Sequence, residues 1–396
     1  MKEPVSFSAF YFKDFRLFWV GQIVSYSGTW MHSTAQGWLV YSLTKSPFYL
    51  GIVSAAGSLP VLFFTLVGGV VADRVAKRNL LLLTSALSMI PAVLIGALTS
   101  IEIISVWHVM ALAVFLGTVN AFDLPARQSF LVEMVERGNL LNAIALNSAA
   151  FNGARIIGPI IAGMTIAYIG LPACFYLNAL SFVAVIIALS MIKAKGEKRE
   201  TRGLMKELCE GMRFVKGEPQ VRKVMLSVAV FSLFAIPFIT LLPVFAEEIL
   251  DVGVKGLGFL SGSAGGGAFT AAMMLAFIGD IKEKQKLQRL TTMLLPISLI
   301  IFSLSKNYYL SMASLVVTGW AVVTFLAISN SYIQLKTPDG LRGRVMSLYT
   351  LVFLGMAPIG NSLIGIVADM FGSAMAVTVG SSICLLASAI IMGKRT

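Results

Sequence analysis

Charged residues are scarce in this sequence. Asp, Glu, Lys and Arg make up 13% of the 396 residues, whereas a soluble globular protein has roughly 25%. Hydrophobic residues make up 57%, which is more apolar surface than a water-soluble core can bury. This composition excludes an ordinary soluble domain and predicts a protein that crosses a membrane several times.

Cysteine is also rare, which excludes several kinds of site. The three cysteines, Cys174, Cys209 and Cys384, are too scattered for a disulfide framework or a thiolate metal site. The sequence has no glycine-rich nucleotide-binding loop with its Lys-Ser/Thr, and no nucleophile and base at a recognisable spacing. We therefore expect no enzymatic activity, no metal and no cofactor.

Long apolar runs dominate what is present. A helix needs about 20 apolar residues to cross ~30 Å of hydrocarbon, and these runs are too long and continuous for the ~10-residue alternating strands of a β-barrel. The sequence predicts an all-α integral membrane protein with twelve spans, at residues 16–42, 47–72, 79–99, 104–128, 140–167, 171–192, 221–248, 256–279, 287–305, 308–334, 344–368 and 373–393. The first residues lack the pattern of a cleavable signal peptide, so we expect the first span to be a membrane helix and the protein to lie in the plasma (inner) membrane.

The positive charge is distributed asymmetrically. The net charge is +12, and an even number of spans places both termini on one side of the membrane. Lys45, Lys255 and Lys306 fall on the other side and Arg155 falls within a span, so 27 of the 31 Lys and Arg residues share the side of the termini. Cytoplasmic loops carry this excess. We expect both termini in the cytoplasm, and we attribute the basic charge to topology and not to nucleic acid binding.

One polar segment divides the chain. Residues 193–223 hold ten basic and five acidic residues. Their hydrophobic neighbours recur at helical spacing, at Leu204, Met205, Leu208, Met212 and Val215. This pattern predicts an amphipathic helix on the cytoplasmic membrane surface, and both a solvated tether and a regulatory segment remain open as its role. The expected units are an N-terminal six-helix bundle (1–192), a linker (193–220) and a C-terminal six-helix bundle (221–396).

The two halves resemble each other in sequence. With an offset of 202, residues 129–170 align without gaps with residues 331–372, and nine of the 42 pairs are identical. Five of the identical pairs are glycines, at 138/340, 153/355, 158/360, 163/365 and 170/372. Two six-helix halves related by a parallel repeat are typical of large secondary transporters.

The turn between the second and third spans, GGVVADRVAKRNLLL, combines glycine with charge. The pattern consists of Gly69, Asp73, Arg74, Lys77 and Arg78. It resembles the loop signature of the major facilitator superfamily, although Ala76 replaces the usual glycine and Lys77 the usual arginine. The alternative is that these are ordinary solvated loop charges.

The resemblance implies a role for this turn as a conformational latch. A carboxylate at the end of one helix is favoured near the positive N-terminus of another helix and near basic groups. In the superfamily this contact holds the cytoplasmic side closed in the outward-facing state. We accordingly expect Asp73 to face the beginning of the eleventh span, between Arg342 and Arg344, and Lys77 to reach Asp123 at the end of the fourth.

The fifth predicted span contains the segment FNGARIIGPIIAG. Its Gly153, Gly158, Pro159 and Gly163 resemble the fifth-helix signature of antiporters of the same superfamily. Small residues allow helices to approach closely in membranes, and proline removes a backbone hydrogen bond and bends a helix. The resemblance implies a face that seals the two halves together, and export by antiport. Generic helix packing is the alternative interpretation.

Four further phrases resemble a narrower branch of the superfamily: GTWMHSTAQGWLVYSLTKSPFYLG, LPARQSFLVEMV, LLPVFAEEIL and TPDGLRGRVMSLY. They are similar to the bacterial exporters grouped with the enterobactin exporter and the macrolide efflux pumps. The resemblance extends over essentially the whole chain. It implies twelve helices in two six-helix bundles and leaves the substrate open.

A few polar residues within the spans are candidates for a central cavity. Arg155 lies near the middle of its span, where an arginine costs about 2.5–3.5 kcal/mol and needs water or a partner, so it either binds substrate or links helices. His32 with Gln36 is a candidate for proton coupling, and a packing histidine is the alternative. Protonated His32 beside Arg155 would link proton and substrate occupancy. Further candidates are the asparagines Asn120, Asn147, Asn152, Asn330 and Asn361.

These observations together predict a secondary transporter. We expect a proton-driven exporter of a small amphipathic organic molecule, such as a siderophore or a drug, that rocks two bundles about a central site. We expect a monomer in the lipid bilayer, with a proton gradient as the driving force. An importer or a lipid or lysolipid translocator on the same fold is the first alternative, and a non-transporting membrane receptor or assembly factor is the second.

Overall fold

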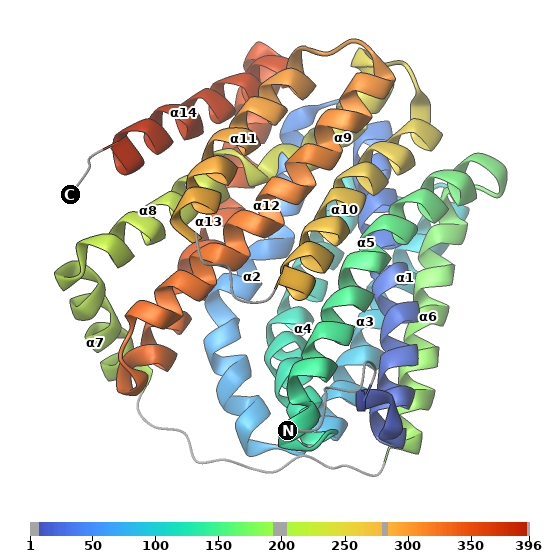
Figure 1. Cartoon of the computed structure of the whole chain (residues 1–396). Helices are drawn as coiled ribbons and strands as arrows, with labels where there is room; N and C mark the ends of the chain where they lie inside the picture. Colours follow the sequence, from blue (N-terminus) through green and yellow to red (C-terminus); the bar gives the residue numbers. More distant parts are fainter. Residues whose placement is uncertain (1–7, 193–203, 279–283, 394–396) are drawn as a thin grey trace.

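The computed structural model describes residues 8–192, 204–278 and 284–393. Helices contain nearly all of these residues, and the described part of the chain contains no β-strand. Figure 1 shows the helices side by side in two groups, with α1, α3, α5 and α6 on the right and α8 and α14 on the left.

The N-terminal half consists of six long helices that alternate in direction. They are α1 (Lys13–Thr44), α2 (Pro47–Arg74), α3 (Lys77–Ser100), α4 (Val106–Glu133), α5 (Leu140–Tyr168) and α6 (Leu171–Met191), with short 3-10 turns η1 (Ser8–Tyr11) and η2 (Arg137–Asn139). Proline occupies the first turn of α2 and of α6, where its missing N–H has no partner within the helix and therefore costs nothing.

The C-terminal half follows a short helix, α7 (Leu204–Gly217). Its elements are α8 (Pro219–Phe234), η3 (Ile236–Leu241), α9 (Leu242–Val244), η4 (Phe245–Ile249), α10 (Gly253–Ile278), α11 (Lys284–Leu304), α12 (Tyr308–Lys336), α13 (Asp339–Phe371) and α14 (Ser373–Gly393). The elements from α8 to η4 together form one membrane span, Pro219–Ile249.

This seventh span is not a continuous α-helix. Pro237 and Pro243 lie inside it, and each lacks the N–H that would continue the α-helical hydrogen bonds. The backbone becomes a 3-10 helix in η3 and a π-helix in η4. Hydropathy predicts the span but not this interruption, which places Glu247 and Glu248 in the π-helical turn.

The expected twelve spans are confirmed, with α1 as a polar exception. Eleven segments are long and apolar enough to cross a membrane by length and hydropathy alone. The 32-residue α1 also carries buried polar residues, including Gln22, Ser25 and His32, which lower its hydropathy. It packs along α5 and α6, so it crosses the same layer as its neighbours.

Two antiparallel helix pairs join the halves, α5 with α10 and α2 with α13. A Cβ added at Gly163 would lie 3.2 Å from the Cα of Gly258. A Cβ added at Gly51 would lie 2.8 Å from the Cα of Gly365. The backbones of each pair are therefore in contact, as small residues permit. We call these contacts the α5–α10 seam and the α2–α13 seam.

The internal repeat predicted from the sequence is visible in these contacts. Gly163 and Gly365 are equivalent positions of the repeat, and each lies in a seam with the opposite half. Gly158 and Gly360 are also equivalent, and each packs against the first span of its own half, α1 and α8 respectively. In the fifth span of each half, one glycine therefore allows close packing within the bundle, and another allows close packing between the two bundles.

The two halves are joined at one end of the molecule. We call this end, with the turns at 45–46, 169–170 and 250–252, the closed end, and the opposite end, with the turns at 75–76 and 337–338, the linker end. Four polar contacts join described residues of the halves at the closed end: Tyr41 with Glu248, Lys45 with Glu247, Ser46 with Asp369 and Tyr168 with Lys255. In Figure 1 the halves diverge toward the linker end, at the bottom of the view.

The amphipathic helix predicted in the linker is confirmed as α7, and residues 193–203 of that linker lie outside the described residues. The helix packs against the beginning of α13, where Glu210 forms an ion pair with Arg344. Val215 is buried and Met212 is exposed. Its expected contact with the membrane surface stays a prediction.

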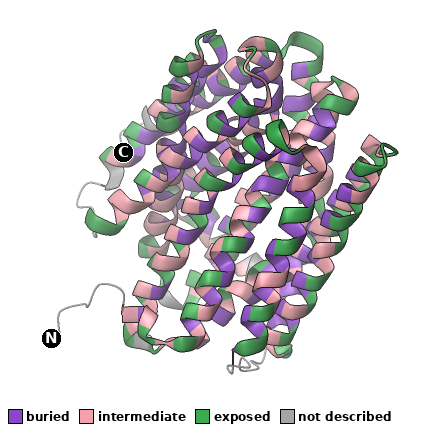
Figure 2. Cartoon of the chain, turned by 90° about the vertical axis from the view of Figure 1, so that its right-hand side faces the viewer, coloured by how far each residue is buried: buried purple, intermediate pink, exposed green. Residues whose placement is uncertain are grey.

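Figure 2 shows buried residues on the faces that helices turn toward one another and exposed residues around the perimeter. One hydrophobic cluster, which includes Phe231, Phe245 and Phe325, extends from the C-terminal half to α1 and α2. A second cluster, around Phe15 and Phe130, lies within the N-terminal half. The shared cluster adds apolar contact between the halves to that of the two seams.

Close packing of α10 against α12 yields a first prediction. A Cβ at Gly267 would lie 1.8 Å from the carbonyl oxygen of Val316, whereas a Cβ at the adjacent Gly266 would meet nothing within 4 Å. Overpacking of this kind costs about 1–3 kcal/mol. We expect Gly267→Ala to lower the unfolding temperature of the purified protein and Gly266→Ala to leave it unchanged. Equal losses in both variants would contradict this packing.

Candidate functional site

Arg155 lies on α5 at the linker-side part of the α5–α10 seam. A Cβ at Gly265 would stand 2.4 Å from the Arg155 carbonyl oxygen, so α10 lies directly against the backbone of α5 at this point. The Arg155 side chain extends in another direction, toward α1, and is half-buried. The seam thus fixes the position of an ionisable side chain within the membrane span.

The Arg155 guanidinium lies over the first of three aromatic rings that contact one another in a row. Its Cζ lies 5.3 Å from the centre of the Trp30 ring, which is within range of a cation–π interaction. The ring of Phe151 lies 5.8 Å from that of Trp30 and 5.3 Å from that of Tyr26. We call Tyr26, Trp30, Phe151 and Arg155 the arginine–aromatic cluster.

The cluster leaves the hydrogen-bonding groups of Arg155 unused. Among the described residues, the guanidinium has no hydrogen bond or ion pair, and its one contact of note is the face of Trp30. A guanidinium presents five N–H donors in a planar fork, and a charge at this depth is unfavourable without a partner. Chemically, the cluster can bind carboxylate or carbonyl oxygens beside a flat apolar surface.

Sequence reasoning found only part of this cluster. It singled out Arg155 for its charge, but it overlooked Tyr26 and Phe151. Helical spacing offered a signal, because Tyr26 and Trp30 are four residues apart on α1 and Phe151 precedes Arg155 by four on α5. Residues at that spacing share a helix face.

His32 and Gln36 occupy a different face of α1. The His32 Nε2 lies 3.2 Å from the Gln36 Oε1, and the imidazole meets the Phe175 ring of α6 edge-on at 5.0 Å. His32 is buried, and its Nδ1 has no hydrogen-bond partner among the described residues. The expectation that His32 lies beside Arg155 is wrong, because α1 turns His32 toward α6 and Trp30 toward α5.

The asparagines are dispersed over both halves. Asn152 is buried and donates to the Ser148 carbonyl oxygen at 2.9 Å, and Asn330 accepts from Gln334 at 2.6 Å. Asn361 on α13 accepts from Thr240 of η3 at 3.3 Å. Asn147 of α5 is hydrogen-bonded to the Tyr26 side chain of α1, whereas Asn120 has no hydrogen bond that the described residues supply. The contacts of the first three are local, so their roles in a central cavity stay predictions.

The charged turn after α2 makes contacts within its own half. Lys77 is almost fully buried and pairs with Glu133 at 2.6 Å. The prediction that Lys77 contacts Asp123 is therefore wrong. The carboxylate that pairs with Lys77 belongs to Glu133 at the end of α4, whereas Asp123 lies further inside that helix. Arg78 donates to the Leu189 carbonyl oxygen at 2.7 Å, where a cation is favoured by the C-terminus of α6.

The other members of this turn have few contacts in this conformation. Asp73 is half-buried and has no hydrogen bond or ion pair with described residues, and Arg74 is exposed. A Cβ at Gly69 would meet nothing within 4 Å. The latch predicted from the sequence is therefore not formed in this conformation, in which the linker end is open.

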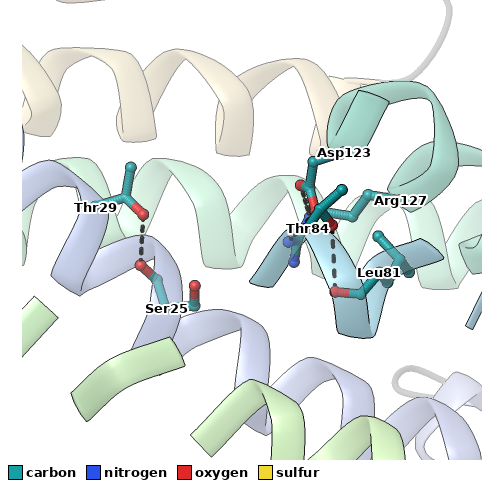
Figure 3. A network of polar contacts seen from close by, with 6 residues as sticks. All are labelled: Ser25, Thr29, Leu81, Thr84, Asp123 and Arg127. Atoms are coloured by element: carbon teal, nitrogen blue, oxygen red, sulfur yellow. Dashed lines mark hydrogen bonds and ion pairs between the residues drawn. The ribbon is translucent and has the colours of Figure 1, made fainter. Parts of the chain in front are cut away.

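Asp123 belongs to a buried polar network of the N-terminal half (Figure 3). Arg127, one turn later on α4, donates to both carboxylate oxygens of Asp123 at 2.6 and 2.9 Å. Thr84 of α3 donates to the same carboxylate at 2.7 Å. Only 11% of each charged side chain is exposed. The network ties α3 to α4 and fully satisfies one buried charge with another.

The four residues of the fifth-span signature do not share one partner. Gly163 and Pro159 face α10, because a Cβ at Gly258 would lie 2.7 Å from the Pro159 carbonyl oxygen. Gly158 faces α1, and a Cβ at Gly153 would meet nothing within 4 Å. The helix continues through Gly158–Pro159 without interruption, from Leu140 to Tyr168.

The chain is similar in sequence to known transporters. The family model described as transmembrane secretion effector matches residues 5–395. The chain is 25% identical to the staphyloferrin A transporter of Staphylococcus aureus, over 90% of each chain. It is 27% identical to the multidrug efflux pump Tap of Mycolicibacterium fortuitum, over 85% of this chain and 84% of the pump.

A solved structure supports the fold. A bacterial homologue of the human lysosomal transporter Spinster, in an inward-facing and unoccupied conformation, superposes with a TM-score of 0.75. The match covers 98% of this chain and 97% of the homologue at 12% identity. The likeness therefore confirms the expected twelve-helix, two-bundle fold.

The buried pair of Asp123 and Arg127 yields a second prediction. Removing one partner of a buried ion pair leaves an uncompensated charge and costs about 3–5 kcal/mol. We expect Asp123→Leu and Arg127→Leu each to lower the free energy of unfolding by that order, and the double variant to lose less than either single variant.

Unfolding in denaturing detergent, followed by circular dichroism, measures these losses. The exposed pair of Lys45 and Glu247, with 59% and 36% of the side chains accessible, is the matched control. Glu247→Gln should change the free energy of unfolding by less than about 1 kcal/mol. Additive losses at Asp123 and Arg127 would show that the pair is not coupled.

Proposed function

Because the chain belongs to the transmembrane secretion effector family, we propose that it is a proton-coupled exporter of a small amphipathic organic molecule, such as a siderophore or a drug. The arginine–aromatic cluster carries this proposal. It combines a guanidinium with unused donors and flat apolar rings, which match the oxygen atoms and the apolar body of such a molecule.

The sidedness of the charges supports the direction. The linker end carries most of the Lys and Arg residues, and we propose that it faces the cytoplasm, with both termini there and the protein in the plasma (inner) membrane. The halves part at the linker end, so the arginine–aromatic cluster would receive substrate from the cytoplasm in this conformation. The similarity to a named efflux pump agrees with export.

We propose that transport proceeds by alternating access in a monomer, with the halves rocking from this conformation to one closed at the linker end. The geometry of the α2–α13 seam supports a specific closing contact. Gly51 lies against Gly365, and Leu62 lies 2.9 Å from a Cβ added at Gly355. Antiparallel helices keep this register along the seam. Asp73 follows Leu62 by eleven residues on α2, and Arg344 precedes Gly355 by eleven residues on α13, so Asp73 and Arg344 occupy matching positions.

Closure would therefore exchange the partner of Arg344. In this conformation Arg344 pairs with Glu210 of α7, whereas Asp73 has no partner among the described residues. Extending the α2–α13 seam to the linker end would bring Asp73 alongside Arg344 and form the latch. We propose His32 as the proton-binding group. It lies on the face of α1 opposite the arginine–aromatic cluster.

Transport by everted membrane vesicles tests the export proposal. Respiration acidifies the vesicle lumen, and a pH-sensitive dye reports release of protons when a candidate substrate is added. The candidates are a hydroxycarboxylate siderophore, a catecholate siderophore, a macrolide and a lysolipid. Substrate-dependent proton release accompanied by substrate uptake supports export. Accumulation in right-side-out vesicles alone would favour an importer, and binding without movement would favour a receptor.

Arg155 provides the third prediction. We expect Arg155→Ala to reduce kcat/KM for the transported molecule by about tenfold or more, because a charge-assisted hydrogen bond is worth about 1.5–3 kcal/mol. Arg155→Lys should restore only part of this loss, because lysine lacks the planar fork. The matched control is Lys255→Ala, which removes a cation 4.2 Å from the Tyr168 ring at the closed end. Equal effects at both positions would argue against a specific role for Arg155.

The register of the α2–α13 seam provides the fourth prediction. We expect Asp73→Arg and Arg344→Asp each to lower the maximal exchange rate about tenfold, because each places like charges together at closure. The double variant should recover most of the rate. As a control, Asp73→Arg combined with Arg342→Asp should show no recovery, since Arg342 is out of register. Equal recovery of the exchange rate in both double variants would contradict the proposed pairing.

A further inference from the structure

A cavity of about 520 Å³ lies at the closed end of the C-terminal half, away from the arginine–aromatic cluster. It lies between α9 and η4 of the broken span, the end of α11 and the beginning of α14. Cavities of about 300–1,000 Å³ are typical of small-molecule sites. We call this cavity the outer pocket.

The wall of the outer pocket is mostly apolar, with side chains such as Val244, Leu304, Phe371 and Met375. Phe371 and Met375 are themselves more than half exposed, so the pocket opens to the surroundings of the protein. A ligand with a sizeable apolar body would cover this surface. The removal of both apolar surfaces from water would contribute favourable binding free energy.

Three polar side chains lie in this wall, and one of them, Thr378, already bonds to Ser303 and to the Ala374 carbonyl oxygen. Glu248 contributes a carboxylate from the π-helical turn η4. Ser373, at the beginning of α14, is 6% exposed, and its Oγ has no hydrogen-bond partner among the described residues. A buried hydroxyl without a partner is unfavourable, so a ligand that supplied the missing hydrogen bond would be favoured.

The charges around the pocket determine which charge a bound ligand should carry. Glu247 adjoins Glu248 in sequence and is paired with Lys45 at 3.4 Å, so the negative charge of Glu248 is left without a cation in the described part of the chain. Glu248 is exposed, so an anionic head group would be repelled by its carboxylate and a neutral one would gain no charge attraction from it. An ammonium group has donors for both the carboxylate and the Ser373 oxygen.

We infer that the outer pocket is a second ligand site, which binds an amphipathic amine through Glu248 and Ser373. The ammonium donates to the carboxylate and to the Ser373 Oγ, and the apolar body lies on the surrounding wall. This inference does not depend on the direction or the coupling of transport. The same chemistry describes a free hydrophobic amine and the head of an ethanolamine lipid.

Occupancy of this site is linked to the contact between the halves. The hydroxyl of Tyr41, on α1 of the N-terminal half, donates to the same Glu248 carboxylate. An ammonium bound to Glu248 competes with this bond and so weakens one of the contacts that hold the closed end together. Removing the tyrosine hydroxyl therefore tightens amine binding, whereas removing the carboxylate charge weakens it.

Binding to the purified protein in nanodiscs of phosphatidylglycerol, without any gradient, tests the inference. The probe is an alkylamine that carries a dansyl fluorophore, and its Kd is measured by fluorescence. We expect saturable binding, a Kd at least tenfold higher for Glu248→Gln, about threefold higher for Ser373→Ala, and severalfold lower for Tyr41→Phe. The matched control Glu247→Gln, next to Glu248 but outside the pocket wall, should leave the Kd unchanged.

Two further comparisons complete the test. The matching dansyl alcohol, which lacks the charge, should bind at least tenfold more weakly than the amine. Replacing part of the phosphatidylglycerol by phosphatidylethanolamine distinguishes the sources: competition with the probe identifies the lipid head group as occupant, and no competition identifies a free amine. An amine Kd that Glu248→Gln and Ser373→Ala leave unchanged, or that Glu247→Gln raises as much as Glu248→Gln does, would overturn the inference.

Discussion

Direct contact of backbones across two glycine seams is the constraint on which the rest of the structure depends. Lipid tails are as apolar as the side chains of the two halves, so their association in a membrane depends on close packing and on polar contacts. Gly163 on Gly258 and Gly365 on Gly51 provide that packing, and Gly163 and Gly365 are equivalent positions of the repeat. The four polar contacts that join described residues of the halves all lie at the closed end.

The α5–α10 seam explains why arginine and Gly-Pro occur in one short segment. The small residues on one side of α5 bring its backbone against α10, and this fixes the height and rotation of the helix. Arg155 then projects from another side, where Trp30 covers one face of its guanidinium. The repeat places Ala357 opposite Arg155, so the scaffold is shared by both halves while the charge belongs to one.

Hydropathy and the repeat were sufficient to predict the spans and the two bundles. They could not predict which charges pair. Lys77 selects Glu133 and Asp123 selects Arg127 because the rotation of each helix decides which side chains meet, and a loop signature carries no information on rotation. The same limit explains His32: Trp30 precedes it by two residues, which places the two side chains on nearly opposite faces of α1.

Most of the polar contacts at the closed end are weak individually, and this weakness suits the alternating access that we propose. Lys45 and Glu247 are exposed, and such pairs contribute about 0–1 kcal/mol each. Two conformations can be populated in turn only if their free energies are similar, since a bound molecule shifts the balance by no more than its difference in affinity for the two. A closed end held by glycine packing and by polar bonds that are mostly exposed meets this condition, whereas a buried pair such as Asp123–Arg127 across the halves would not.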